Sequence, residues 1–125
     1  MNSLEISKKI YNILSNSELL TEKVGDKIFP LIAEADTDFP FVVFRRNGIT
    51  PIYTKDWLTE ERVTVDIVCA SNKYFESVEV AQIVRNLIEG YHDNSVRQTR
   101  LTYITEDFTN DCYAQRMTFE FSTNA

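Results

Sequence analysis

A stretch in the middle of the chain, Arg62 to Ala70, constrains the fold more than any other part of the sequence. Its apolar residues occupy every second position, which places them together on one face of a strand. They are Val63, Val65, Ile67 and Cys69. Asp66 lies on the opposite face in mid-strand. We therefore expect a sheet that is covered on one face and not buried along the whole length of the other.

The clearest helix follows this strand directly. Ser71 or Asn72 can cap its start, and Gly90 lies near its end, where glycine often terminates helices. Between them apolar residues recur at helical spacing, at Val78, Ala81, Val84, Leu87, Ile88 and Tyr91. An earlier helix is expected from Ser3 onward, and Ser17 can cap a further short turn that ends near Leu20.

The remaining strands are predicted from short apolar runs and turn residues. Asn47-Gly48 separates the runs Phe41–Arg46 and Ile49–Tyr53, and this dipeptide is a strong hairpin signal because both residues tolerate a positive φ. The segment from Thr54 to Glu60 is predicted to be a loop. Further extended segments are expected over residues 27–29, 99–106 and 113–122.

The order helix, strands, helix, strands predicts an α+β fold, with an antiparallel sheet and two helices packed on one face. The chain has 125 residues, close to the commonest size of one domain, so residues 1–125 are expected to form a single small domain. The hydrophobic fraction of 43% and the charged fraction of 26% are ordinary for a globular protein and argue against disorder.

Composition also limits the surroundings and the partners of the protein. Cys69 and Cys112 lie far apart in sequence, so we expect two reduced thiols and a reducing compartment. No apolar run approaches the length of about 18 residues that crosses a bilayer, so no membrane association is expected. The formal net charge of −6 argues against sequence-specific nucleic-acid binding.

The sequence offers no pattern typical of a catalytic, metal or cofactor site. His92 is the only histidine, and metal-binding pairs of cysteine or histidine are absent. The three glycines are isolated and cannot build a phosphate-binding loop. Asp107 and Asp111 could serve a hydrolase or nuclease, but they lack the ligand spacing and glycine of a calcium loop. We therefore expect no enzyme activity and no cofactor.

Five residues form a candidate protein interface: Arg45, Arg46, Tyr53, Lys55 and Trp57. Arginine mixed with aromatic residues on a protruding loop is typical of protein interfaces. The basic residues could instead keep an edge strand soluble, and the tryptophan could fold back onto the core.

Several segments, in this order and spacing, resemble the tail-completion (tail-terminator) proteins of long-tailed bacteriophages and prophages. The resemblance spans roughly Leu14 to Phe121 and includes no sharp motif. Its segments are Val24–Pro30, Asp38–Phe44, Tyr53–Asp56, Glu61–Ile67 and Ala81–Ile88.

The resemblance implies an α+β fold and a homo-oligomeric ring, commonly of six subunits, that caps the tail tube. It also implies contacts with the tail tube protein and with a head-completion protein. The expected location is the bacterial host cytoplasm during assembly and then the virion tail, with DNA passing through the ring. It implies no catalytic residues. The alternative from a different class is a small dimeric regulatory or ligand-binding α+β domain.

Overall fold

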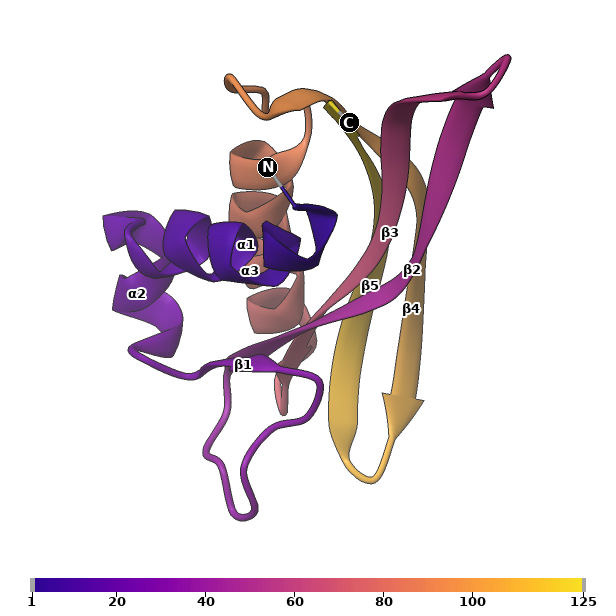
Figure 1. Cartoon of the computed structure of the whole chain (residues 1–125). Helices are drawn as coiled ribbons and strands as arrows, with labels where there is room; N and C mark the ends of the chain where they lie inside the picture. Colours follow the sequence, from indigo (N-terminus) through magenta and orange to yellow (C-terminus); the bar gives the residue numbers. More distant parts are fainter. Residues whose placement is uncertain (1, 125) are drawn as a thin grey trace.

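The computed structural model describes residues 2–124 and contains one five-stranded sheet with helices on one face (Figure 1). The strand order is β1-β2-β3-β5-β4. The elements are a 3-10 turn at Ser3–Glu5, α1 (Ile6–Ser15), α2 (Glu18–Val24), β1 (Ile28–Pro30), β2 (Phe41–Thr54), β3 (Trp57–Ser71), α3 (Tyr74–Ile88), β4 (Val96–Thr109) and β5 (Cys112–Asn124). The predicted α+β class is confirmed.

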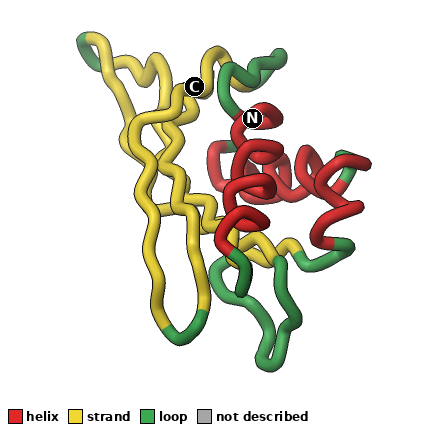
Figure 2. The backbone as a smooth tube through the Cα atoms, turned by 180° about the vertical axis from the view of Figure 1, so that it is seen from behind, coloured by secondary structure: helices red, strands yellow, loops and turns green. Residues whose placement is uncertain are grey.

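The core lies between the sheet and the helices, as the alternation in the central strand predicts. β3 is paired on both sides, with β2 and with β5, and its apolar set is fully buried. α1 and α3 contribute the opposite half of the core, through Ile6, Ile10, Leu14, Val80, Val84 and Ile88. β5 adds Met117, Phe119 and Phe121. The other face of the sheet carries no helix (Figures 1 and 2).

Two details of the predicted architecture are wrong. The sheet is mixed, because β1 pairs parallel with β2, with Ile28 opposite Val42. The long loop over residues 31–40 makes this possible, since it returns the chain to the start of β2 where a tight turn would have reversed it. The helix layer contains three α-helices where two were predicted, because the segment capped by Ser17 continues to Val24. No helix among residues 2–124 is long and apolar enough to cross a membrane.

The predicted hairpin at Asn47-Gly48 is also wrong. β2 continues through this dipeptide to Thr54, and the register with β3 shifts between Arg46 and Gly48. Asn47 is therefore the extra residue of a β-bulge, where one strand gains a residue without reversing. The chain turns at Lys55-Asp56, inside the segment predicted to be a loop. Lys55 adopts the positive φ that such a turn requires.

The second hairpin, β4–β5, is longer than predicted. Its turn is Asn110-Asp111, and both residues have a positive φ. Phe119 and Phe121 are fully buried in the core, whereas Tyr103 is 63% exposed. A register shift between Leu101 and Tyr103 interrupts the alternation of β4. The two hairpins extend in opposite directions beyond the helix layer (Figure 1).

Candidate protein interface

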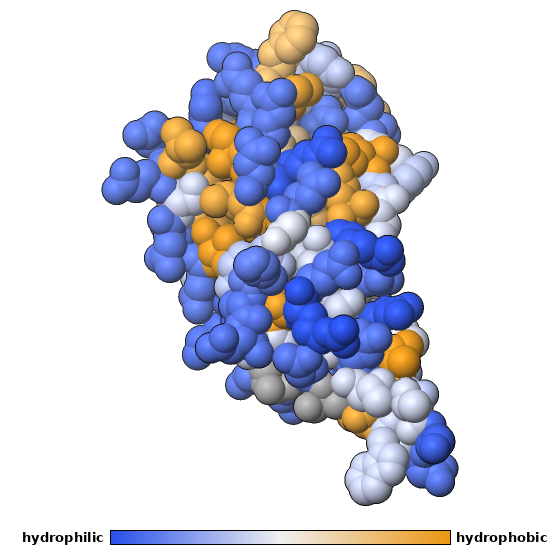
Figure 3. Space-filling model, turned by 90° about the horizontal axis from the view of Figure 1, so that it is seen from above, coloured by the Kyte–Doolittle hydropathy of each residue, from blue (hydrophilic) through white to orange (hydrophobic). Residues whose placement is uncertain are grey.

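The tip of the β2–β3 hairpin presents large aromatic side chains to solvent. Trp57 is 77% exposed and Tyr53 is 62% exposed, so the tryptophan does not fold back onto the core. Lys55 lies in the turn between them, and Leu58 follows on β3. Seen from above, the tip projects at the lower right as a mixture of pale, orange and blue residues (Figure 3). Exposed aromatic residues beside a cation have the composition of an interface hot spot.

The structure separates the two predicted arginines from this tip. Arg45 and Arg46 lie in the middle of β2, because the chain does not reverse at Asn47-Gly48. Arg46 donates to the main-chain oxygen of Leu4 at 3.0 Å and so ties β2 to the first turn of the chain. Arg45 is exposed, opposite Asp66 on β3. Only Tyr53, Lys55 and Trp57 of the five predicted residues therefore gather at one place.

A second exposed aromatic cluster was not predicted from the sequence. Tyr74 and Phe75 begin α3 and pack edge-to-face on each other. Tyr74 also meets Tyr113 of the β4–β5 hairpin, and Tyr113 packs on Phe108. The ring centroids of Tyr74 and Tyr113 are 5.6 Å apart, and those of Phe108 and Tyr113 are 4.6 Å apart. Phe75 is 75% exposed. The available signal was two consecutive aromatic residues at the start of α3.

The face of the sheet without helices is rich in arginine. Strand alternation and register place Arg45, Arg62, Arg97, Arg100 and Arg116 on it. Three carboxylates lie among them and pair with four of them. The ion pairs are Arg62–Glu60 and Arg97–Glu60 at 3.6 Å, Arg100–Glu120 at 3.0 Å and Arg116–Asp66 at 3.6 Å.

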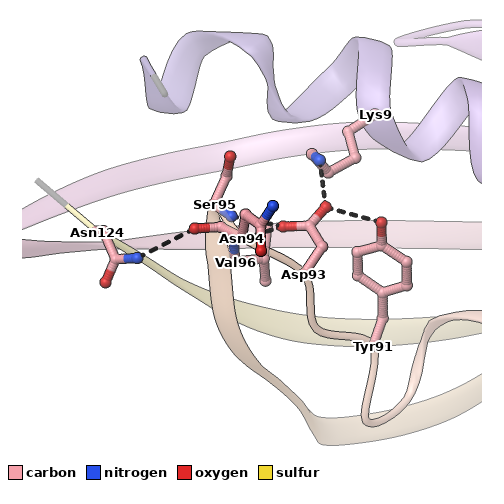
Figure 4. Close-up of polar contacts among 7 residues, drawn as sticks. All are labelled: Lys9, Tyr91, Asp93, Asn94, Ser95, Val96 and Asn124. Atoms are coloured by element: carbon pink, nitrogen blue, oxygen red, sulfur yellow. Dashed lines mark hydrogen bonds and ion pairs between the residues drawn. The ribbon is translucent and has the colours of Figure 1, made fainter.

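Asp93 is the most fully bonded carboxylate of the described residues, and it fastens the helix layer to the loop before β4. It accepts from Lys9 of α1, from the Tyr91 hydroxyl and from the backbone N–H groups of Ser95 and Val96 (Figure 4). Burial alone would raise the pKa of Asp93. The bonds from Lys9 and the other donors outweigh burial and hold this pKa well below its ordinary value. With its acceptor sites occupied, Asp93 has a structural role.

The acidic residues and the histidine that the sequence singled out for possible chemistry are all exposed. Asp107 is exposed on β4, and Asp111 lies in the β4–β5 turn. His92 is exposed in the loop after α3. Burial raises the pKa of the Cys69 thiol, which is fully enclosed, and burial also raises the pKa of Cys112. Within residues 2–124, no group of three His, Cys, Asp or Glu side chains is placed to hold a metal ion.

Comparison with solved structures finds the same arrangement of elements in another protein. A chain from the "Virion of native gene transfer agent (GTA) particle" superposes with a TM-score of 0.79 at 10% sequence identity. The match covers 93% of this chain and 92% of that chain. This fold also occurs in a virion. Comparison of the sequence with family models finds no match, and neither does comparison with curated proteins.

Proposed function

We propose that this protein is a structural subunit of a phage-like particle, and specifically a tail-completion subunit that forms a ring on the end of the tail tube. The observation that carries the proposal is the superposition on a virion chain over nearly the whole length of both chains. The segments that resemble tail-completion proteins support the narrower role. In this role the protein acts through assembly with other subunits, and its partners are the tail tube protein and a head-completion protein.

The shape of the subunit suits a ring. A closed ring of identical subunits needs two different surfaces that fit each other, because each contact is head-to-tail. The described residues present several exposed surfaces at different places, among them the β2–β3 tip and the aromatic cluster that joins α3 to the β4–β5 hairpin. The tip residues Tyr53, Lys55 and Trp57 remain our proposed contact with a neighbouring subunit or with the tail.

Deletion of the gene from the genome that carries it tests this function. We expect particles whose tails vary in length and filled heads that lack tails, because neither tail termination nor head joining would occur. Supplying the protein from a plasmid should restore tailed particles. Normal tailed particles from the deletion strain would contradict the proposal.

A further inference from the structure

A groove on the helix-free face of the sheet is lined largely by charged groups. Its volume is about 560 Å³, and its walls come from β3, β4 and β5. The lining residues are Glu60, Arg62, Arg97, Gln98, Arg100, Glu120 and Ser122. The register of β4 shifts between Val96 and Gln98, which makes Arg97 the extra residue of a bulge. Bulges re-aim side chains, and this one places Arg97 against Glu60 across the groove.

The groove presents cations to solvent. The side chains of Arg97 and Arg100 are 57% and 59% exposed, whereas those of Glu60 and Glu120 are only 16% and 23% exposed. Arg100 donates a hydrogen bond to Glu120 at 3.0 Å, and Arg97 forms an ion pair with Glu60 at 3.6 Å. Arginine groups fixed in this way are prepared to bind further carboxylates through paired hydrogen bonds.

The same chain carries a short acidic loop that would fit this groove. Glu34, Asp36 and Asp38 occupy alternate positions in the loop between β1 and β2, and all three are exposed. Leu31 and Ile32, at the start of the same loop, are 65% and 78% exposed. The loop lies at the opposite end of the molecule from the β2–β3 tip (Figures 1 and 2). Groove and loop are therefore different surfaces of one subunit, as a head-to-tail contact requires.

We propose that the arginine groove of one subunit binds the acidic loop of a second copy of this chain. This inference rests on the proposed function, since it names a contact that would join neighbouring subunits of the ring. One observation favours a protein loop over nucleic acid as the occupant. The loop adds exposed apolar residues, Leu31 and Ile32, that can pack on a protein surface beside the groove.

Complementary charge reversal tests the contact. The groove variant is Arg97→Glu with Arg100→Glu, and the loop variant is Glu34→Lys with Asp38→Lys; Asp36 is left unchanged because its φ is positive. Each variant alone should associate at least roughly tenfold more weakly than the wild type, because like charges then face each other. An equimolar mixture should assemble again, since in an alternating ring every loop meets a groove of opposite charge. Sedimentation velocity over a concentration series measures the association of each variant alone and of their equimolar mixture, against the wild type.

A matched control reverses two cations away from the groove. Arg85 lies on α3 and Lys23 on α2, on the helix side of the sheet. Arg85→Glu with Lys23→Glu replaces two cations by two anions, which is the same change in net charge as in the groove variant. This control should associate like the wild type. Circular dichroism and thermal unfolding check that each variant folds. If a reversal variant fails to fold, Arg97→Gln with Arg100→Gln replaces the groove variant and Glu34→Gln with Asp38→Asn replaces the loop variant. These neutral variants should each weaken association.

Several results would overturn this inference. One is that both variants fold and that each, by itself, assembles at the same concentrations as the wild type. The ring would then form through other contacts. Another is a mixture that stays dissociated. A third is that the wild-type protein does not self-associate at all. The proposed function would then still be tested by the gene deletion, which does not depend on this contact. Binding of a labelled DNA duplex that is lost in the groove variant and unchanged in the loop variant would assign the groove to nucleic acid.

Discussion

Removal of the Asp93 carboxylate should destabilise the fold more than removal of any exposed acid of the helix layer. The carboxylate joins α1 to the loop before β4 through four donors, one of them the ammonium group of Lys9 (Figure 4). Hydrogen bonds to charged groups contribute about 1.5–3 kcal/mol each. These contributions are not additive, and the side chain is 26% exposed, so water replaces part of the loss. We expect Asp93→Ala to lower the free energy of unfolding by about 2–3 kcal/mol.

Asp93→Asn separates the contribution of the negative charge from that of the hydrogen bonds that shape the turn. The amide oxygen can still accept from the backbone N–H groups of Ser95 and Val96, whereas the attraction to Lys9 is lost. We expect a loss of about 1 kcal/mol at pH 7. Urea unfolding followed by circular dichroism measures both variants, and Lys9→Met with the double variant Lys9→Met/Asp93→Asn completes a cycle for the coupling energy.

The pH dependence of this loss has a definite direction. The pKa of Asp93 is lower in the folded state than in the unfolded chain, where an aspartate titrates near pH 4. The stability that the carboxylate contributes is therefore fully present above about pH 5 and is lost as the pH falls toward the folded pKa. The wild type and Asp93→Asn should differ less at pH 3 than at pH 6. A difference that is constant between these two pH values would refute the role assigned to the charge.

Three substitutions and one chemical assay test the packing and the surface. Trp57→Ala should leave the free energy of unfolding unchanged within about 0.5 kcal/mol, because the side chain is mostly exposed, but it should weaken ring assembly measured by sedimentation. Phe119→Ala should cost about 3–5 kcal/mol in urea unfolding, because it empties a fully buried site next to β3. Gly25→Ala should cost about 1–3 kcal/mol, since φ 63° and ψ −129° suit glycine almost alone; a cost near zero would contradict this reading. In a thiol-reagent assay at pH 8, Cys112 should react first and Cys69 only on unfolding; equal rates for the native protein would show that Cys69 is not enclosed.

The parts of the fold that could be predicted from the sequence are those set by local periodicity. The central strand from Arg62 to Ala70 buries the face that its alternation marks. For α3 the pattern predicts the helix but only part of its buried face, because Val84 and Ile88 are buried whereas the predicted Val78 is half-buried. Val80, outside the predicted set, is fully buried. The hairpin at Asn47-Gly48 could not be predicted correctly, because pairing along the whole of β2 with β3 outweighs the local preference of a dipeptide for a turn. The bulge that absorbs Asn47 depends on that long-range register.

The surfaces were harder to predict than the core. Tyr53, Lys55 and Trp57 could be grouped from the sequence because they are close together in it; their role as an interface stays a prediction. The arginine groove combines Arg62 of β3 with Arg97 and Arg100 of β4, and β5 lies between these strands. Only the sheet order and the bulge at Arg97 bring these side chains to one place. The aromatic cluster of Tyr74 and Tyr113 likewise joins distant segments.

Ring assembly is tested most directly by the solution mass of the wild-type protein. Size exclusion with light scattering over a concentration series gives this mass, and negative-stain imaging shows the shape of the largest species. Assembly into a closed ring of about six subunits with a central hole is the predicted result, with head-to-tail contacts between copies. A dimer whose mass does not change with concentration, and in which no ring is seen, would contradict it and favour a dimeric regulatory or ligand-binding domain.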